Sequence, residues 1–483
     1  MNSNNTKHEI TSNIIWHMAE RWGCQIVAFV VTIIISRQLD PSVYGIVTIT
    51  NAFLSVFAVF LEGGLGNALI QKKDSDQLDF STVFYTNIVL CSFIYIIIYL
   101  VAPYVAKYYN EPQLASLLRV SGITILISAL KNIQEAYVSK NMIFKKFFVS
   151  SLLGTIMAGV VGIVMAIKGF GAWAIVGSNL TDVIVDAIIA WMIIEWRPTL
   201  EYSFNRLRGL LDFGGKYFFV TLIDRIYNKT YHLSIGKYCS PADLAYYEKG
   251  YSISGKIADN TNTVVSSVLF PAMSNNQDDA QKLKEITKKS LQINIYVMTP
   301  VLMGIIAVSD PLIRVVLTEK WVMAIPYLRL FCLINLISPF EYINNNVIKS
   351  LGRSDMLLKQ ELINKSINII ILIICLQVGA IYVCIGRLIA TLIDAIIKSV
   401  LANKLIGYSI VDQIKDTKES ILMGTVMLVV VYAISFIDMN LLLMLIIQIL
   451  VGIIAYLGLS ILTKSESFYF VLDYINSFRK KKS

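Results

Sequence analysis

Eleven of the 42 basic residues lie inside long apolar blocks, where a charged side chain is energetically unfavourable. A charged side chain at the centre of a bilayer costs at least ~2.5–3.5 kcal/mol, so such residues commonly face a hydrated cavity or an opposite charge. Five of them lie deep in their blocks and outnumber the acids nearby, which favours a cavity that receives an anion such as a diphosphate. These five are Arg21, Arg225, Lys229, Lys249 and Lys256.

Uncharged polar side chains recur in the same blocks at helical spacing. The block 326–347 carries Asn335, Ser338, Tyr342 and Asn345, and Pro339 predicts a kink in it. Hydroxyl and amide groups on one helix face suit the hydroxyls of a sugar. The candidate glycan contacts are Asn51, Asn260, Tyr342 and Asn345.

Acidic residues in the apolar blocks are candidate sites for a coupling proton or sodium ion. Glu20 and Asp224 each precede an arginine, and Asp259 lies on the polar stripe of the block 243–269. Two other acid–base pairs lie near block ends and are interpreted as structural ion pairs, namely Lys131/Glu135 and Asp394/Lys398.

Three patterns that resemble catalytic or metal-binding motifs are interpreted as coincidence. Gly250, Gly255 and Lys256 have phosphate-loop spacing, but Ile257 follows where a hydroxyl would ligate Mg²⁺. Asp74-x-Asp76 lies in a short loop with no nucleotide-sugar domain around it. The three histidines and six cysteines have no metal-ligand spacing, so we expect neither a metal nor a disulfide framework.

The composition is that of a membrane protein rather than a soluble enzyme. Apolar residues make up 56% of the 483-residue chain and charged residues 16%, with a mean hydropathy of +0.64. Apolar blocks of roughly 20 residues are long enough to cross a bilayer as helices. About fourteen spans are predicted, at 13–36, 44–69, 80–103, 114–136, 147–167, 172–195, 213–235, 243–269, 290–309, 326–347, 360–378, 380–402, 420–437 and 441–462.

Basic residues in the connecting segments predict the orientation of the spans. One set of alternate loops, with both tails, holds 25 lysines and arginines, and the other set holds 6. Because positive loops stay on the cytoplasmic side, both termini are predicted to be cytoplasmic. No loop is long enough for a catalytic domain, so we expect a protein that is not an enzyme and that binds no nucleic acid. The net charge of +9 therefore mostly marks the cytoplasmic face.

Two pairs of similar loops indicate an internal repeat. The segment Arg37–Gly45 resembles Gly236–Tyr246, and Gly171–Gly177 resembles Gly379–Gly386, both at an offset of about 200 residues. Six spans per copy keep the same orientation, as in transporters built from two parallel lobes. The expected organisation is a first lobe over 1–210, a second lobe over 211–404, and two further helices with a basic cytoplasmic tail over 405–483.

Short motifs along nearly the whole chain resemble the Wzx-type polysaccharide flippases, a family within the superfamily that includes the MATE antiporters and the lipid II flippase MurJ. In the first half these are Arg37-x-Leu39-x-Pro41-x-x-Tyr44-Gly45, the run Gly64–Lys72, and Lys168–Trp173. In the second half they are Val268–Ser274 followed by Gln277–Asp279, then Thr318–Trp321 and Ser350–Asp355. The chain is most similar to the branch that serves lipopolysaccharide, exopolysaccharide or teichuronic acid export.

The resemblance implies an all-α multi-pass protein of the bacterial cytoplasmic membrane, with two six-helix lobes, a basic cavity and two C-terminal helices. It implies alternating access that carries an undecaprenyl-diphosphate oligosaccharide to the outer leaflet, beside the polymerase and glycosyltransferases of one pathway. No cofactor is expected beyond a proton or sodium gradient. Relatives often have an Asp where this chain has Tyr231, which removes support for coupling through that carboxylate.

Two alternatives stay open at this point. A MATE-like antiporter of drugs or cations would share the architecture but would need an acidic cavity. A membrane polymerase or glycosyltransferase would need a long external loop or a soluble domain.

Overall fold

The computed structural model describes residues 23–62, 64–470 and 472, and every regular element within these residues is a helix. A first helical segment covers Gly23–Gln38. The labelled helices are α2 Pro41–Glu62, α3 Leu65–Gln71, α4 Gln77–Tyr109, α5 Gln113–Asn141, α6 Phe144–Ile167, α7 Ala172–Ile193, α8 Phe204–Tyr238, α9 Pro241–Ser274, α10 Ala280–Val316, α11 Ile325–Ser350, α12 Ser354–Leu376, α13 Ala380–Ile406, α14 Ile410–Ala433 and α15 Leu441–Leu462, with short 3₁₀ turns η1 Glu319–Ala324 and η2 Ile434–Phe436.

Ten of the described helices are long and apolar enough to cross a membrane, which confirms the multi-pass, all-helical class. Four of the fourteen predicted spans are not among these ten: 13–36, 213–235, 243–269 and 360–378. α8 and α9 cover the second and third of these, and both are long helices with many polar residues. A span count of fourteen therefore stays a prediction.

Several helices extend beyond their apolar blocks because capping residues, not hydropathy, decide where they begin. α10 starts ten residues before the predicted span, at Ala280, where the Asp279 carboxylate accepts a hydrogen bond from the Lys282 amide at 3.0 Å. α14 likewise starts at Ile410, where the Ser409 hydroxyl accepts from the Asp412 amide at 3.2 Å. Such side chains satisfy the free N–H groups of a first helical turn.

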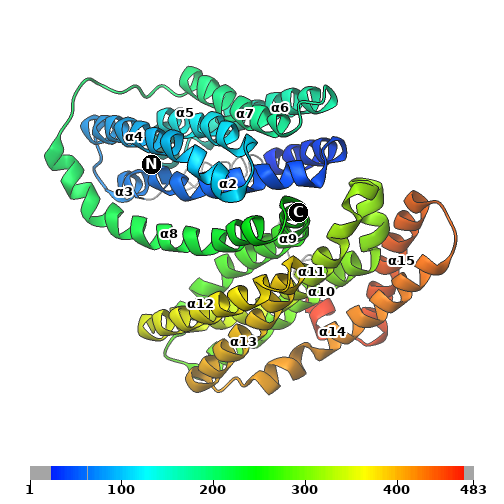
Figure 1. Cartoon of the computed structure of the whole chain (residues 1–483). Helices are drawn as coiled ribbons and strands as arrows, with labels where there is room; N and C mark the ends of the chain where they lie inside the picture. The colour runs from blue at the N-terminus through cyan, green and yellow to red at the C-terminus, as the bar shows by residue number, and fades with distance from the viewer. Residues whose placement is uncertain (1–22, 63, 471, 473–483) are drawn as a thin grey trace. The chain divides into compact units, whose positions relative to one another are not determined.

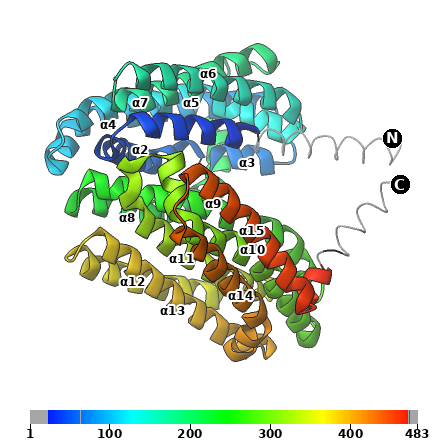
Figure 2. The same cartoon turned by 90° about the vertical axis from the view of Figure 1, so that its right-hand side faces the viewer.

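By its internal contacts the chain divides into a first unit, Met1–Ala245, and a second unit, Tyr246–Ser483. Figures 1 and 2 show α6 beside α7 and α4 beside α5 in the first unit, and α12 beside α13 in the second. The predicted lobe boundary at residue 210 follows the sequence repeat, whereas packing groups α8 with the helices that precede it.

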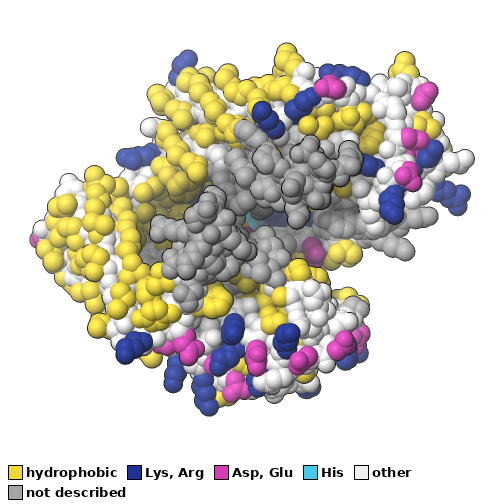
Figure 3. Space-filling view, turned by 180° about the vertical axis from the view of Figure 1, so that it is seen from behind, with side chains coloured by type: hydrophobic (Ala, Val, Ile, Leu, Met, Phe, Trp, Pro, Cys, Tyr) yellow, Lys and Arg dark blue, Asp and Glu magenta, His cyan; other side chains and the backbone are white. Residues whose placement is uncertain are grey.

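The surface of the second unit is apolar where α14 and α15 lie, at the left of Figure 3. α15 exposes a run of large side chains at this surface, including Ile446, Leu450, Ile453, Ile454 and Leu457. The buried side of α15 includes small and polar residues, among them Gly452 and Gln448. An apolar outer face with a polar inner face is typical of a helix that contacts lipid.

Gly45 lies where no side chain fits, because an ideal Cβ there would stand 1.7 Å from the Pro241 carbonyl oxygen. We expect Gly45→Ala to lower the free energy of unfolding by about 1–3 kcal/mol, since the backbone of α2 must move away from the start of α9. Thermal unfolding of the purified protein in detergent measures this. Gly209→Ala is the control, because its Cβ would meet nothing within 4 Å. Equal melting temperatures for the two variants would contradict the prediction.

Candidate functional site

A polar pocket of about 330 Å³ lies within the second unit, between α9, α11 and α13. Its α9 wall consists of residues three and four apart, and its α11 wall of residues at the spacing i, i+3, i+4 and i+7, so each helix presents one face. α13 adds a lysine. The lining residues are Asp259, Asn262, Thr263, Ser338, Glu341, Tyr342, Asn345 and Lys398.

Hydrogen bonds between side chains hold the two main walls of the pocket together. The Asn262 amide donates to the Ser338 hydroxyl at 3.2 Å, and the Asn294 amide of α10 donates to the Asn262 carbonyl oxygen at 3.1 Å. One level away, the Asn335 amide donates to Ser254 at 3.0 Å. This ladder fixes the register of α9 against α11.

Three acceptor groups that line the pocket have no donor among the described residues, although hydroxyls, an amide and the Lys398 ammonium also line it. Within the described part of the chain, the carboxylates of Glu341 and Asp259 have no hydrogen-bond or ion-pair partner, and the Asn345 side-chain oxygen is buried without a donor. Asp259 lies at the exposed mouth of the pocket and Glu341 is more enclosed. A buried acceptor without a donor costs free energy, so Glu341 and Asn345 suit a bound cation, a water or a protonated group, with the exposed Asp259 beside them.

One wall of the pocket is a buried ion pair. The Lys398 ammonium lies 2.7 Å from the Asp394 carboxylate, with side chains 7% and 4% exposed, and the Gln360 amide also donates to Asp394. The predicted ion pair is confirmed, and its structural role stays a prediction. The Lys131–Glu135 pair in the first unit is also confirmed at 2.6 Å, and Lys131 contacts Asp186 as well.

Two cations of the second unit are held against aromatic rings rather than in open space. The Lys249 side chain is buried with its ammonium 5.2 Å from the centre of the Trp321 ring. The Arg387 guanidinium donates to the Tyr247 hydroxyl at 2.7 Å and lies 5.3 Å from the Tyr251 ring. Cation–π contacts of this kind let a positive charge persist away from water.

The predicted site residues are distributed over both units. The structure brings together Asp259, Tyr342 and Asn345, which line the polar pocket. Lys256 and Asn260 lie one turn apart on α9 near Asp259, with Lys256 exposed. The predicted residues of the first unit are Asn51, exposed on α2, and Asp224, Arg225 and Lys229 on α8. Arg21 and Glu20 lie outside the described residues.

Sequence reasoning missed Glu341 and left Arg387 out of the site. Glu341 shares the helical stripe of Ser338, Tyr342 and Asn345, so its spacing carried the signal. From the sequence alone, a glutamate close to a proline and an aromatic residue is easily taken for a charge at the membrane interface, because the facing helix is not known. The role of Arg387 was harder to predict, because its aromatic partners lie on α9 and α11, far from it in the sequence.

An apolar groove of about 460 Å³ lies between α10, α14 and α15. Its floor includes Gly304 and Gly452, and its walls include Val308, Met427 and Ile453. Gln448 is a polar residue along it, and its amide donates to the Ser435 hydroxyl at 2.8 Å. The apolar lining of this groove suits a hydrocarbon chain.

A family profile described as polysaccharide biosynthesis protein matches residues 34–326 of the chain. The chain belongs to this family. The resemblance that the motifs indicated is therefore confirmed. Among curated relatives, the teichuronic acid biosynthesis protein TuaB of Bacillus subtilis is 24% identical over 308 residues, which cover 62% of this chain and 63% of TuaB.

Two further relatives of this polysaccharide biosynthesis protein family carry names that refer to transport or lipopolysaccharide. The succinoglycan biosynthesis transport protein ExoT of Rhizobium meliloti is 23% identical over 67% of this chain and 66% of its own length. The lipopolysaccharide biosynthesis protein WzxC of Escherichia coli is 22% identical over 75% of each chain. The match to TuaB and to ExoT thus spans just under two thirds of either protein.

Solved structures confirm the transporter fold of this family member. The lipid II flippase MurJ in an inward closed conformation matches with a TM-score of 0.75 and 17% identity, over 93% of this chain and 99% of that structure. An inward-facing multidrug resistance MATE family transporter matches with a TM-score of 0.63 and 14% identity, over 79% of this chain and 94% of that structure. At these identities the likeness establishes the fold.

Proposed function

We propose that this protein is a flippase that moves an undecaprenyl-diphosphate-linked oligosaccharide from the inner to the outer leaflet of the bacterial cytoplasmic membrane by alternating access. The observation that carries the proposal is membership of the polysaccharide biosynthesis protein family together with a transporter fold that spans 93% of the chain. The protein acts after the glycosyltransferases that assemble the oligosaccharide and before or beside the polymerase of the same pathway, and it is not itself an enzyme.

The diphosphate is the part of the cargo that needs cations. Arg225 and Lys229 lie one helical turn apart on α8, and Lys256 is an exposed lysine of α9. Arg21 and Lys249 are the other members of the proposed anion-binding set, but Arg21 lies outside the described residues and Lys249 is buried against Trp321. Exposed or half-buried lysines and arginines on transport helices suit a doubly charged diphosphate better than a cationic drug.

The polyprenyl tail needs an apolar path, and the groove between α10, α14 and α15 offers one within the second unit. Its two glycines keep it open, because an added Cβ at Gly304 meets only the end of Met427 at 4.0 Å. We expect Gly304→Leu to reduce the transport rate of a long-chain polyprenyl cargo several-fold by filling the groove.

Leaflet accessibility of a labelled lipid measures the effect of Gly304→Leu, and the same assay with a short-chain analogue is its comparison. Gly458→Leu is the matched control, because this α15 glycine has nothing within 4 Å and does not line the groove. Equal loss for long and short chains would mean that the groove does not hold the tail.

The two carboxylates of the polar pocket that have no partner in the described part of the chain support coupling of transport to an ion gradient. Asp259 and Glu341 are the proposed sites that exchange a proton or a sodium ion, and both line the pocket beside Asn345. Glu20 and Asp224 are the other candidates from the sequence. In this proposal the cations of α8 and α9 hold the cargo, and the pocket of the second unit holds the driving ion.

Reconstitution tests the proposed function directly. Wild-type protein in vesicles with a labelled lipid-linked oligosaccharide should expose the label to the opposite leaflet, and Arg225→Ala or Lys256→Ala should slow this at least tenfold. Lys107→Ala, an exposed lysine at the end of α4, is the matched control and should transport normally. If both cavity variants flip lipid at the wild-type rate, the cargo site is wrong. If wild type moves only cationic drugs, the MATE-like alternative replaces this proposal.

A further inference from the structure

α8 belongs to the second copy of the sequence repeat, yet its contacts place it in the first unit, which ends at Ala245. It packs against α2, α3 and α4. Figure 1 shows that it curves along its length. If α8 moves with the first unit during transport, the hinge between the units lies after α8. If it moves with the second unit, the hinge lies before α8.

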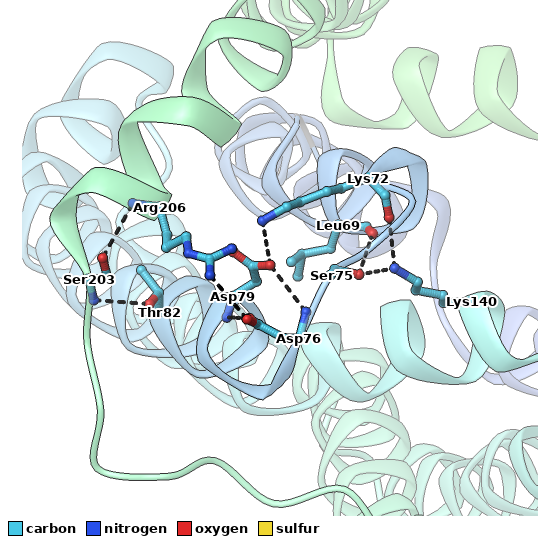
Figure 4. A network of polar contacts seen from close by, with 9 residues as sticks. All are labelled: Leu69, Lys72, Ser75, Asp76, Asp79, Thr82, Lys140, Ser203 and Arg206. Carbon is cyan, nitrogen blue, oxygen red and sulfur yellow. Dashed lines mark hydrogen bonds and ion pairs between the residues drawn. The ribbon is translucent and has the colours of Figure 1, made fainter.

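The cytoplasmic end of α8 is fastened to α4 by charge. Arg206 in its first turn lies 3.2 Å from the Asp76 carboxylate and 3.5 Å from that of Asp79 (Figure 4). The Asp79 side chain is fully buried, and Lys72 holds its other oxygen at 2.5 Å. A buried carboxylate that loses one of two cations is left poorly compensated, so this contact resists separation.

Neutral hydrogen bonds reinforce the same end. The Ser203 amide donates to the Thr82 hydroxyl at 3.1 Å, and the Thr199 amide donates to Ser81 at 3.0 Å. Asp76 itself caps α4: its carboxylate accepts from the Asp79 amide, which together with Arg206 lowers the pKa of Asp76. Asp76 therefore stays ionised at neutral pH and keeps its attraction for Arg206.

The other end of α8 is fastened to α4 as well. The Tyr109 hydroxyl donates to the Leu233 carbonyl at 3.0 Å. The Lys237 ammonium donates to the Tyr108 carbonyl and lies 4.3 Å from the centre of the Tyr108 ring. Nearby, the α8 backbone at Gly236 approaches α2 so closely that a Cβ would stand 2.8 Å from Ile49.

The two fastenings are 31 residues apart, from Arg206 to Lys237, which is roughly 46 Å along a helix and exceeds the ~30 Å hydrocarbon core. Alternating access opens one side of the membrane at a time. A helix of the opposite lobe would therefore contact the first unit at one side only, whereas α8 is held at both.

We propose that α8 moves as part of the first unit throughout the transport cycle, clamped to α4 at both membrane faces. The two units then articulate in α9 after Ala245, where the first unit ends, rather than in the segment that precedes α8. This inference goes beyond the cargo, since it requires only that the units move.

Pulsed electron paramagnetic resonance on the full-length protein in vesicles tests the inference without any cargo. Spin labels at Tyr104 of α4 and Ile226 of α8, in a variant without native cysteines, report the clamp, and both positions are exposed. Labels at Ile226 of α8 and Ile363 of α12 report the distance between α8 and the second unit. A label pair at Tyr104 and Leu153 is the reference, because it gives the width of the distance distribution between two helices of the first unit.

We expect the Tyr104–Ile226 distance distribution to be as narrow as the Tyr104–Leu153 one and narrower than the Ile226–Ile363 one, at acidic and neutral pH and with or without sodium. An Ile226–Ile363 distribution as narrow as or narrower than the Tyr104–Ile226 one would overturn the proposal. Arg206→Ala with Lys237→Met should at least double the Tyr104–Ile226 width. An unchanged width in this variant would show that these contacts are not the clamp.

Discussion

Glu341→Gln is expected to remove the dependence of transport on an ion gradient while the protein stays folded. The amide has the shape of the carboxylate but neither its charge nor its proton, so a pocket whose acceptors are Glu341, Asp259 and Asn345 loses its most enclosed anion. The rate gained from an imposed proton or sodium gradient should fall at least tenfold, as measured by lipid flipping in vesicles with and without the gradient.

Glu285→Gln provides the matched control for Glu341→Gln. Glu285 is an exposed glutamate near the start of α10, outside the polar pocket, and its change to an amide is chemically the same. Asp259→Asn should have an intermediate effect, because Asp259 lies at the mouth where water can replace it. Full gradient stimulation in Glu341→Gln, or equal loss in Glu285→Gln, would refute the assignment of the coupling ion to this pocket.

The surroundings of Glu341 explain why one carboxylate matters so much there. The charged groups that act on it are Asp394, Lys398 and Arg387 of α13 and Glu361 of α12. Lys398 is already paired with Asp394, and Arg387 is engaged with Tyr247. Both cations act on Glu341 from a distance, but neither forms an ion pair with it in the described part of the chain, so its carboxylate can accept a mobile cation.

The helices were largely predictable because most apolar blocks end at strong local signals. α15 has the predicted bounds, 441–462, since Asn440 caps its start and polar residues follow its end. α8 and α9 were the weakest predicted spans because both carry many polar residues, and neither is among the helices that are apolar enough to cross a membrane by composition.

The site was only partly predictable because spacing gives a helix face but not its partner. The stripe on α11 was visible in the sequence, yet its meaning depends on α9 and α13 lying opposite. The Asp74-x-Asp76 motif shows the converse, since Asp76 is neither catalytic nor merely solvated: it caps α4 and binds Arg206. Only the packing of α8 on α4 reveals that role.

Lys398→Met is expected to destabilise the second unit by about 3–5 kcal/mol, because it leaves the Asp394 carboxylate buried with only the Gln360 amide as a donor. Thermal unfolding in detergent should show a lower melting temperature and a smaller folded yield. The double change Lys398→Met and Asp394→Asn should recover most of the loss, since neither charge is then left in the interior. If the double variant is as unstable as the single one, the cost comes from packing around α13 and not from the unpaired charge. Recovery would instead mean that the ion pair adds little stability beyond the mutual neutralisation of its two buried charges.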